Sequence, residues 1–209
     1  MGTARLLSVN VVHAVTQGYW ADTAIDKRPV AGVARIGELG VEGDRQLASS
    51  HGGPDKAVYA YAQEDADWWA DELGRAFGPG LVGENLRTSG VDVSGALIGE
   101  QWRIGDVLLE VRQPRTPCKN LSARLGLEGF HLRFNRTGRV GALCRVLETG
   151  TLRAGDPVEV GERPDHDLTI ADLARGPDPE QMRRLLDSGV PLAANVRAKA
   201  RRMVKRLDS

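Results

Sequence analysis

One cysteine lies in a sequence setting that suits chemistry. Residues 113–121 read QPRTPCKNL, so Cys118 stands between a proline and a lysine, with Arg112, Arg115 and Arg124 nearby. Cationic neighbours favour the thiolate, which is the nucleophilic and metal-binding form of cysteine. The two prolines of the motif bar a helix and stiffen the loop. The pattern leaves two interpretations open: a surface loop that happens to contain a cysteine, or a presented ligand or nucleophile.

A second polar patch is the stretch HGGPDKAVYAY, which opens with His51, Gly52 and Gly53 and continues to Lys56. Glycines let the backbone approach a ligand closely, and a run of free N–H groups beside a lysine could hold a phosphate. A plain turn that leads into a strand explains the same residues, and the sequence alone favours it somewhat. His51 is a candidate acid, base or ligand, although an isolated histidine is more often structural.

Two further segments combine asparagine, arginine and glycine. They are VGENLRTSG at 82–90 and RFNRTGRVG at 133–141. The planar guanidinium of Arg136 suits a phosphate or the edge of a pterin. Both segments are equally compatible with loops between strands. The chain has no H-E-x-x-H, no paired C-x-x-C, no Walker loop and no G-x-S-x-G elbow.

Composition excludes several classes of protein. Lys plus Arg and Asp plus Glu both number 28 among 209 residues, so overall charge argues for neither nucleic acid nor a membrane as partner. Two cysteines are too few for a disulfide scaffold or for an iron–sulfur cluster held within the chain. The first apolar stretch is too short for a signal peptide or a membrane span, so we expect a cytoplasmic location. The basic run at 197–206 contains no aromatic residue, which favours a solvated helix face.

Most of the chain up to residue 161 has strand patterns, and its 25 glycines are spread along it. Many short strands between glycine-rich turns predict a barrel or a sandwich. One helix is expected at 62–78, with core aromatics and Gly78 as its terminator. Cys144 falls in a strand pattern and is expected to pack as a small hydrophobe. The clearest strand patterns lie at 5–15, 57–61, 106–113 and 141–150.

The pattern changes to helices near residue 163. Thr169 is a candidate N-cap of a first helix, and Asp178 followed by Pro179 opens a second. A third is expected to begin at Pro191. We therefore predict a β domain at 1–163 and a small three-helix domain at 164–209.

The motifs occur in an order that resembles the MOSC-domain family, with the closest similarity to its YiiM-type branch. The segments that carry the resemblance are TAIDKRPV, GVEGDRQ, HGGPDKAVYAY, VGENL, IGDVLLEVRQPRTPCKNL and NRTGRVG. They run from about residue 5 to 161, and the tail is similar to the three-helix domain of this branch. The resemblance implies a mainly β fold with helices, a barrel like that of the pyruvate-kinase barrel domain, followed by a small all-α domain.

The resemblance also implies a chemistry. Better-known members bind the molybdenum cofactor and reduce N-hydroxylated compounds such as hydroxylaminopurines or amidoximes. A loop cysteine is the protein's sulfur ligand to molybdenum in those members, and Cys118 holds the matching position. His51 is the candidate proton donor. The residues expected near the cofactor are Lys27, Arg45, His51, Gly52, Gly53, Lys56, Asn85, Arg115, Thr116 and Arg136.

The electrons are expected from outside the chain. No dinucleotide fingerprint follows a strand, and the cysteines cannot hold a cluster, so a flavin or iron–sulfur partner protein is implied. No matched site residue lies beyond 163, so we expect the tail to cover the barrel or a partner. Two alternatives stay open: a sulfur carrier with a persulfide on Cys118, and a non-catalytic cofactor carrier.

Overall fold

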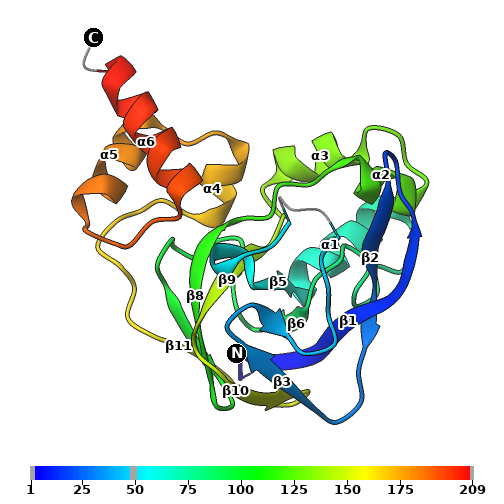
Figure 1. Ribbon diagram of the computed structural model, residues 1–209. Coiled ribbons are helices and arrows are strands. Elements are labelled where there is room, and N and C mark those ends of the chain that lie inside the picture. Colours follow the sequence, from blue (N-terminus) through cyan, green and yellow to red (C-terminus); the bar gives the residue numbers. More distant parts are fainter. Residues whose placement is uncertain (1–2, 48–50, 208–209) are drawn as a thin grey trace.

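The computed structural model describes residues 3–47 and 51–207. In this part of the chain, eight strands form one mixed sheet in the order β11-β7-β8-β9-β5-β6-β1-β2, and three form a small antiparallel sheet in the order β10-β3-β4 (Figure 1). In the large sheet β5 and β6 are parallel. The strands are β1 Arg5–Gln17, β2 Asp22–Pro29, β3 Val33–Gly37, β4 Gly40–Val41, β5 Val58–Ala62, β6 Leu86–Ser89, β7 Gln101–Ile104, β8 Val107–Pro114, β9 Ala142–Glu148, β10 Gly150–Arg153 and β11 Val158–Val160.

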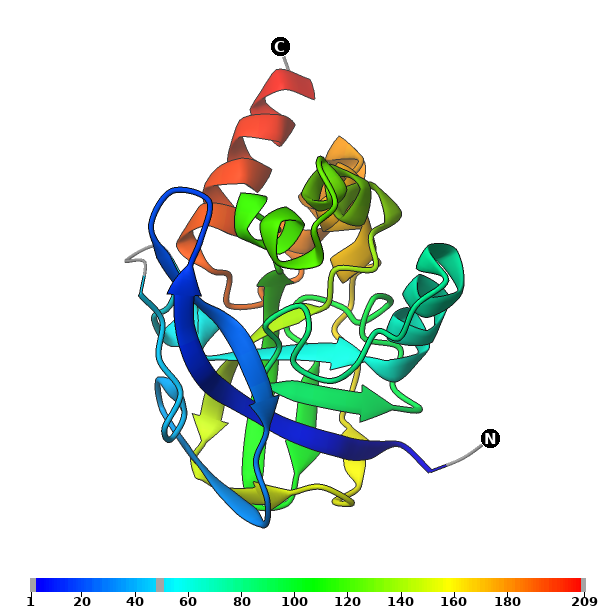
Figure 2. The ribbon, with the colours of Figure 1, turned by 90° about the vertical axis from the view of Figure 1, so that its right-hand side faces the viewer.

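The large sheet closes on itself. The amide of Leu6 in β1 donates to the carbonyl of Asp156 at 2.9 Å, and the amide of Val158 in β11 donates to the carbonyl of Ala4 at 3.0 Å. The first half of β1 pairs with β6 and its second half pairs with β2, with a register shift near Val12 that lets the strand bend (Figure 2). The sheet is therefore a barrel with the β1–β2 hairpin extending from it, which confirms the strand-rich prediction.

Aromatic side chains fill the core beneath α1 (Gln63–Leu73). Trp69 is fully buried and stacks on Phe134 with ring centroids 5.5 Å apart. The prediction that this helix ends at Gly78 was wrong. Gly74 takes the left-handed conformation with φ of 60° and its amide bonds back into the last turn, so the helix ends at Leu73.

Two helices in the barrel region were not predicted from the sequence. They are α2 (Lys119–Leu125), which begins directly after Cys118, and α3 (Phe130–Thr137). Each is closed by a left-handed glycine, Gly126 and Gly138. At seven and eight residues, these helices are too short for an apolar period to stand out in the sequence.

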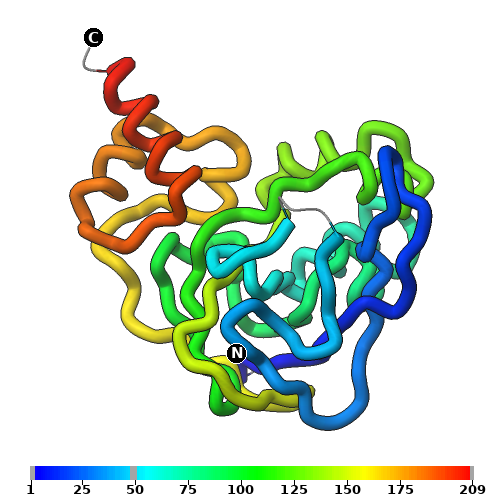
Figure 3. Tube along the Cα trace, in the orientation of Figure 1, coloured from blue at the N-terminus to red at the C-terminus, as the bar shows by residue number. Residues whose placement is uncertain are grey.

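Three helices follow the barrel: α4 (Ile170–Arg175), α5 (Pro179–Asp187) and α6 (Ala194–Leu207). The predicted N-caps are confirmed, because Thr169 and Asp178 both form capping boxes. The start of the third helix is corrected from Pro191 to Ala194. The helices lie together beyond the end of β8 (Figure 3), and their buried side chains belong to the same apolar core as the barrel. The domain boundary near residue 163 stays a prediction.

Among the described residues, no helix combines the length and the apolar character that a membrane crossing requires.

Candidate functional site

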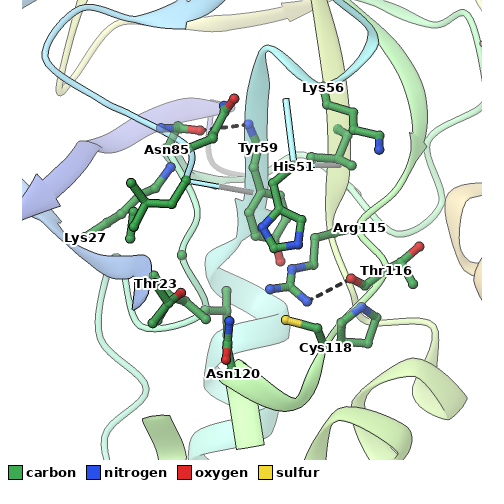
Figure 4. A pocket seen from close by; sticks show the side chains of 18 of the residues that line it. Thr23, Lys27, His51, Lys56, Tyr59, Asn85, Arg115, Thr116, Cys118 and Asn120 are labelled. Atoms are coloured by element: carbon green, nitrogen blue, oxygen red, sulfur yellow. Dashed lines mark hydrogen bonds between the residues drawn. The ribbon is translucent and has the colours of Figure 1, made fainter. Parts of the chain in front are cut away.

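A cavity of about 420 Å³ opens beside the end of β8. Side chains from β2, from the segment after β4, from the turn at 51–56, from β5 and from the loop after β8 all face it (Figure 4). Eight of the expected site residues line it: Lys27, Arg45, His51, Lys56, Asn85, Arg115, Thr116 and Cys118. Segments far apart in the sequence therefore meet at one place.

Cys118 is placed by the end of β8 and the start of α2. The loop between them is anchored by the Arg115 amide, which donates to the Gly141 carbonyl at 3.2 Å, and by Pro117, which is buried. The Cys118 side chain is half-buried and faces the cavity. Cys144 is fully buried in β9, and burial raises the pKa of its thiol well above the ordinary value. The prediction that Cys144 packs as a small hydrophobe is confirmed, and the role of Cys118 as a ligand stays a prediction.

Positive charge dominates the cavity wall. Lys27, Arg45, Lys56 and Arg115 face it, whereas Asp22 is the one carboxylate among the described lining residues. Such a wall attracts anions, and the low-dielectric surroundings strengthen the attraction.

Arg115 is fixed at this wall. Its guanidinium donates to the carbonyl of Thr116 at 3.0 Å and lies 6.0 Å from the centre of the Tyr59 ring (Figure 4). The Tyr59 hydroxyl donates to the Val140 carbonyl at 2.7 Å, which holds the ring in place. The charge of Arg115 is thereby held next to the Cys118 loop.

Lys27 is buried and depends on an acidic partner. Its Nζ lies 2.6 Å from Oδ2 of Asp44, and the same carboxylate accepts the Val12 amide at 3.0 Å and Asn85 Nδ2 at 2.8 Å. Burial lowers the pKa of Lys27, and Asp44 opposes that effect. Asn85 Oδ1 in turn accepts the Tyr59 amide at 3.1 Å (Figure 4). Lys27 and Asn85 are therefore held rigidly at the wall.

Asp44 itself was missed at the sequence level. The GVEGDRQ motif contains it, but only the neighbouring Arg45 was named among the residues expected near the cofactor. In the structure Arg45 is exposed, while the side chain of Asp44 is 5% exposed and organises the residues around it.

His51 is found at the cavity edge. Partial removal of the ring from water lowers its pKa, and the positive charges of Arg115 and Lys56 lower it further. The His51 ring is therefore neutral at physiological pH as long as no anion is bound beside Arg115 and Lys56. An anion that neutralised the two cations would raise the pKa of His51 and make it a better proton donor.

Gly52 and Gly53 do not line the cavity, although they lie in the turn that carries His51. A Cβ on Gly52 would meet Gln46 Oε1 at 2.1 Å, and Gly53 has φ of 92°. These glycines shape the turn. Its far end is held by Asp55, whose carboxylate accepts Arg112 Nε at 2.9 Å and lies 2.8 Å from Arg145.

The structure does not bring Arg136 to the cavity. It is exposed on α3, in a segment that packs against α4. Asn135 Nδ2 donates to the Ala174 carbonyl at 2.9 Å, and Arg175 Nε donates to the Thr137 carbonyl at 3.1 Å. The N-R-T-G motif therefore holds the C-terminal helices and does not form part of the cavity wall.

Several lining residues were not selected from the sequence: Thr23, Tyr59, Gln113, Asn120 and Asn195. The first four lie inside motifs quoted above, and their position in these motifs is the sequence signal that could have identified them. Asn195 lies on α6, beyond the last matched motif, and no sequence signal points to it. The C-terminal helices thus contribute one side chain to the cavity wall.

Cys118 is the soft donor of this cavity. Within the described part of the chain, no group of three or more His, Cys, Asp or Glu side chains could hold a metal ion.

Comparison with known proteins identifies the family. Residues 48–159 match the model of the MOSC domain. The chain is 36% identical over 156 residues to Protein YiiM of Escherichia coli, a match that covers 73% of this chain and 69% of that protein. It is 36% identical over 157 residues to a protein of Gibberella moniliformis named Reductase, covering 73% of this chain and 28% of that one.

Comparison with solved structures supports the same family. The crystal structure of YiiM from Geobacillus stearothermophilus superimposes with a TM-score of 0.78 at 27% identity, covering 96% of this chain and 98% of that one. The chain is a member of the MOSC-domain family and of its YiiM-type branch.

Proposed function

We propose that the protein is a molybdenum-cofactor-dependent reductase of N-hydroxylated compounds, which receives its electrons from a flavin or iron–sulfur partner protein. One observation carries the proposal: a half-buried thiol, Cys118, faces a cavity whose wall bears Lys27, Arg45, Lys56 and Arg115. The relative named Reductase supports the reaction class.

The residues present fit such a cofactor. A thiolate is a soft ligand that suits a thiophilic metal, and Cys118 would supply it. A pyranopterin cofactor also carries phosphate, for which guanidinium and ammonium groups are the natural partners. Lys27, Arg45, Lys56 and Arg115 would hold the anionic part. When bound, the cofactor supplies a metal centre that accepts oxygen from the substrate and passes on two electrons.

The remaining chemistry belongs to the chain. Reduction of R–NHOH to R–NH₂ and water takes up two electrons and two protons. His51 would provide one of these protons, because an anion beside Arg115 and Lys56 raises its pKa toward the range of a useful acid. Asp44 keeps Lys27 in position, and the stiff loop around Pro117 keeps Cys118 in position, so the site is preorganised.

A sulfur carrier is the second candidate, because a half-buried thiol can also carry a persulfide. The cationic wall favours the first candidate, since a persulfide needs no anion site of this size.

To test the proposal, the molybdenum content and the reductase activity are measured on the same purified protein. Protein purified from a molybdenum-replete host should contain molybdenum and release a fluorescent pterin on oxidation. With reduced viologen as donor, it should convert an amidoxime to the amidine. Metal-free protein that carries a persulfide would overturn the proposal in favour of the sulfur carrier, and loaded protein without turnover would indicate a cofactor carrier.

A further inference from the structure

The first turn of α6 reaches the cavity. Asn195 lies in this turn and contributes to the cavity wall. Just before the helix, the carbonyl of Pro191 accepts a hydrogen bond from Nη1 of Arg112, a buried residue of β8. Arg112 Nε also holds Asp55 in the turn that carries His51, at 2.9 Å. The start of α6 is thereby fixed relative to the site.

A chain of hydrogen bonds gives the Asn195 side chain a defined orientation. The carbonyl of Asp55 can only accept, so Gln113 turns Nε2 toward it, at 3.3 Å. Gln113 Oε1 then faces α6 and accepts Asn195 Nδ2 at 2.7 Å. The amide of Asn195 is thereby oriented, and its Oδ1 has no hydrogen-bond partner among the described residues.

The cavity wall has acceptors in Asp22, Thr23, Gln46 and His51, all on β2 or in the segments 45–47 and 51–56. On the rest of the wall, the other side-chain amide oxygens are engaged. The lysines and arginines can only donate. Asn85 Oδ1 is used by the Tyr59 amide, and Asn120 Oδ1 accepts the Tyr19 amide at 2.7 Å. Gln113 Oε1 is used by Asn195. A ligand that carries an N–H group therefore finds a suitable partner in the oxygen of Asn195.

We propose that Asn195 is a substrate-binding residue whose Oδ1 accepts a hydrogen bond from a non-reacting N–H group of the substrate. The inference rests on the proposed function and extends it to the C-terminal helices. An amidoxime, R–C(NH₂)=N–OH, has such a group beside the oxygen that leaves. With two electrons and two protons it gives R–C(=NH)NH₂ and water. The amino nitrogen stays in the product, so its contact with Asn195 orients the substrate throughout the reaction.

The test compares two substrates that differ in this group. Benzamidoxime carries the NH₂ group, and N,N-dimethylbenzamidoxime does not. With reduced viologen as donor, Asn195→Ala should lower kcat/KM for benzamidoxime about tenfold, the effect of one lost hydrogen bond, and leave the dimethyl compound unchanged. Arg201→Gln, an exposed change further along α6, should affect neither substrate.

A binding measurement gives a second readout that needs no turnover. Both the wild type and Asn195→Ala are loaded with cofactor, oxidised and titrated calorimetrically without an electron donor. The Kd of Asn195→Ala for benzamidoxime should be about tenfold higher than that of the wild type, and the Kd for the dimethyl compound should be unchanged. Equal losses for both compounds, or no loss for either, would overturn the role of Asn195 while the wild type still turned over benzamidoxime. A wild type that neither holds molybdenum nor reduces either compound would overturn the proposed function, and the inference with it.

Discussion

Cys118 and Cys144 have opposite surroundings, one facing a cationic cavity and the other enclosed in β9. We expect Cys118→Ser to bring the molybdenum content close to background while the unfolding temperature changes little, because a serine hydroxyl is a hard donor that stays protonated. Metal analysis and thermal unfolding of the purified variant measure both quantities.

Cys144→Ser is the matched control. It should keep the molybdenum and lose about 1–3 kcal/mol of unfolding free energy, because it places a hydroxyl in an apolar site. Equal molybdenum in Cys118→Ser and wild type would show that Cys118 is not the ligand.

The acidity of His51 reports the charge of the cavity. Arg115 lowers the pKa of His51, so Arg115→Gln should raise it, and proton NMR of the imidazole follows this change. Removing a cation stabilises the protonated ring, which fixes the sign. Arg136→Gln removes an arginine outside the cavity and should leave the titration of His51 unchanged. If the pKa of His51 changed equally in Arg115→Gln and Arg136→Gln, the placement of Arg115 beside His51 would be contradicted.

At the scale of elements, the carboxylate of Asp55 ties the turn at 51–56 to two strands of the barrel. Asp55 pairs with Arg112 of β8 and with Arg145 of β9. Asp55→Ala leaves the buried guanidinium of Arg112 with one acidic partner fewer, and we expect it to cost about 1–3 kcal/mol of unfolding free energy, measured with urea.

An exposed ion pair provides the comparison for Asp55. Glu148 pairs with Arg103 on the barrel surface at 2.8 Å. Glu148→Gln should change the unfolding free energy by less than about 1 kcal/mol, because water screens such pairs. A loss in Asp55→Ala no larger than in this control would show that the turn is held by other contacts.

The elements differ in how well the sequence predicted them. Strand β1 and the N-caps Thr169 and Asp178 carried strong local signals, and all three were confirmed. Helices α2 and α3 were missed because seven or eight residues, about two helical turns, show no clear apolar periodicity. Thr23, Tyr59, Gln113 and Asn120 lie in the family motifs but were not selected. Eight residues of the cavity wall were selected by similarity to those motifs. Asn195 was not, because its place depends on how α6 docks on β8, which no local pattern encodes.

At the scale of the molecule, α6 presents a basic surface. Arg197, Arg201, Arg202 and Lys205 are exposed, and the helix has no acidic residue. An acidic electron-transfer protein would be steered toward this face. Turnover driven by such a partner should then fall as ionic strength rises, whereas viologen-driven turnover should change little.

Charge reversal tests the same surface directly. Arg201→Glu combined with Arg202→Glu should slow partner-driven turnover and leave the viologen-driven rate unchanged. Equal rates in the variant and the wild type with the partner would exclude this face as the docking surface.

The closure of the barrel has a consequence for how the protein is made. Strand β1 can pair early with β2, but Leu6 bonds to Asp156, so the barrel can close only after residue 156 has left the ribosome. Contacts this distant in sequence make folding slow, because a long loop must be closed before they form. Lys27, Cys118 and Asn195 can line one cavity only after α6 has been synthesised. Until then, the nascent chain carries Cys118 without all the walls that later enclose it.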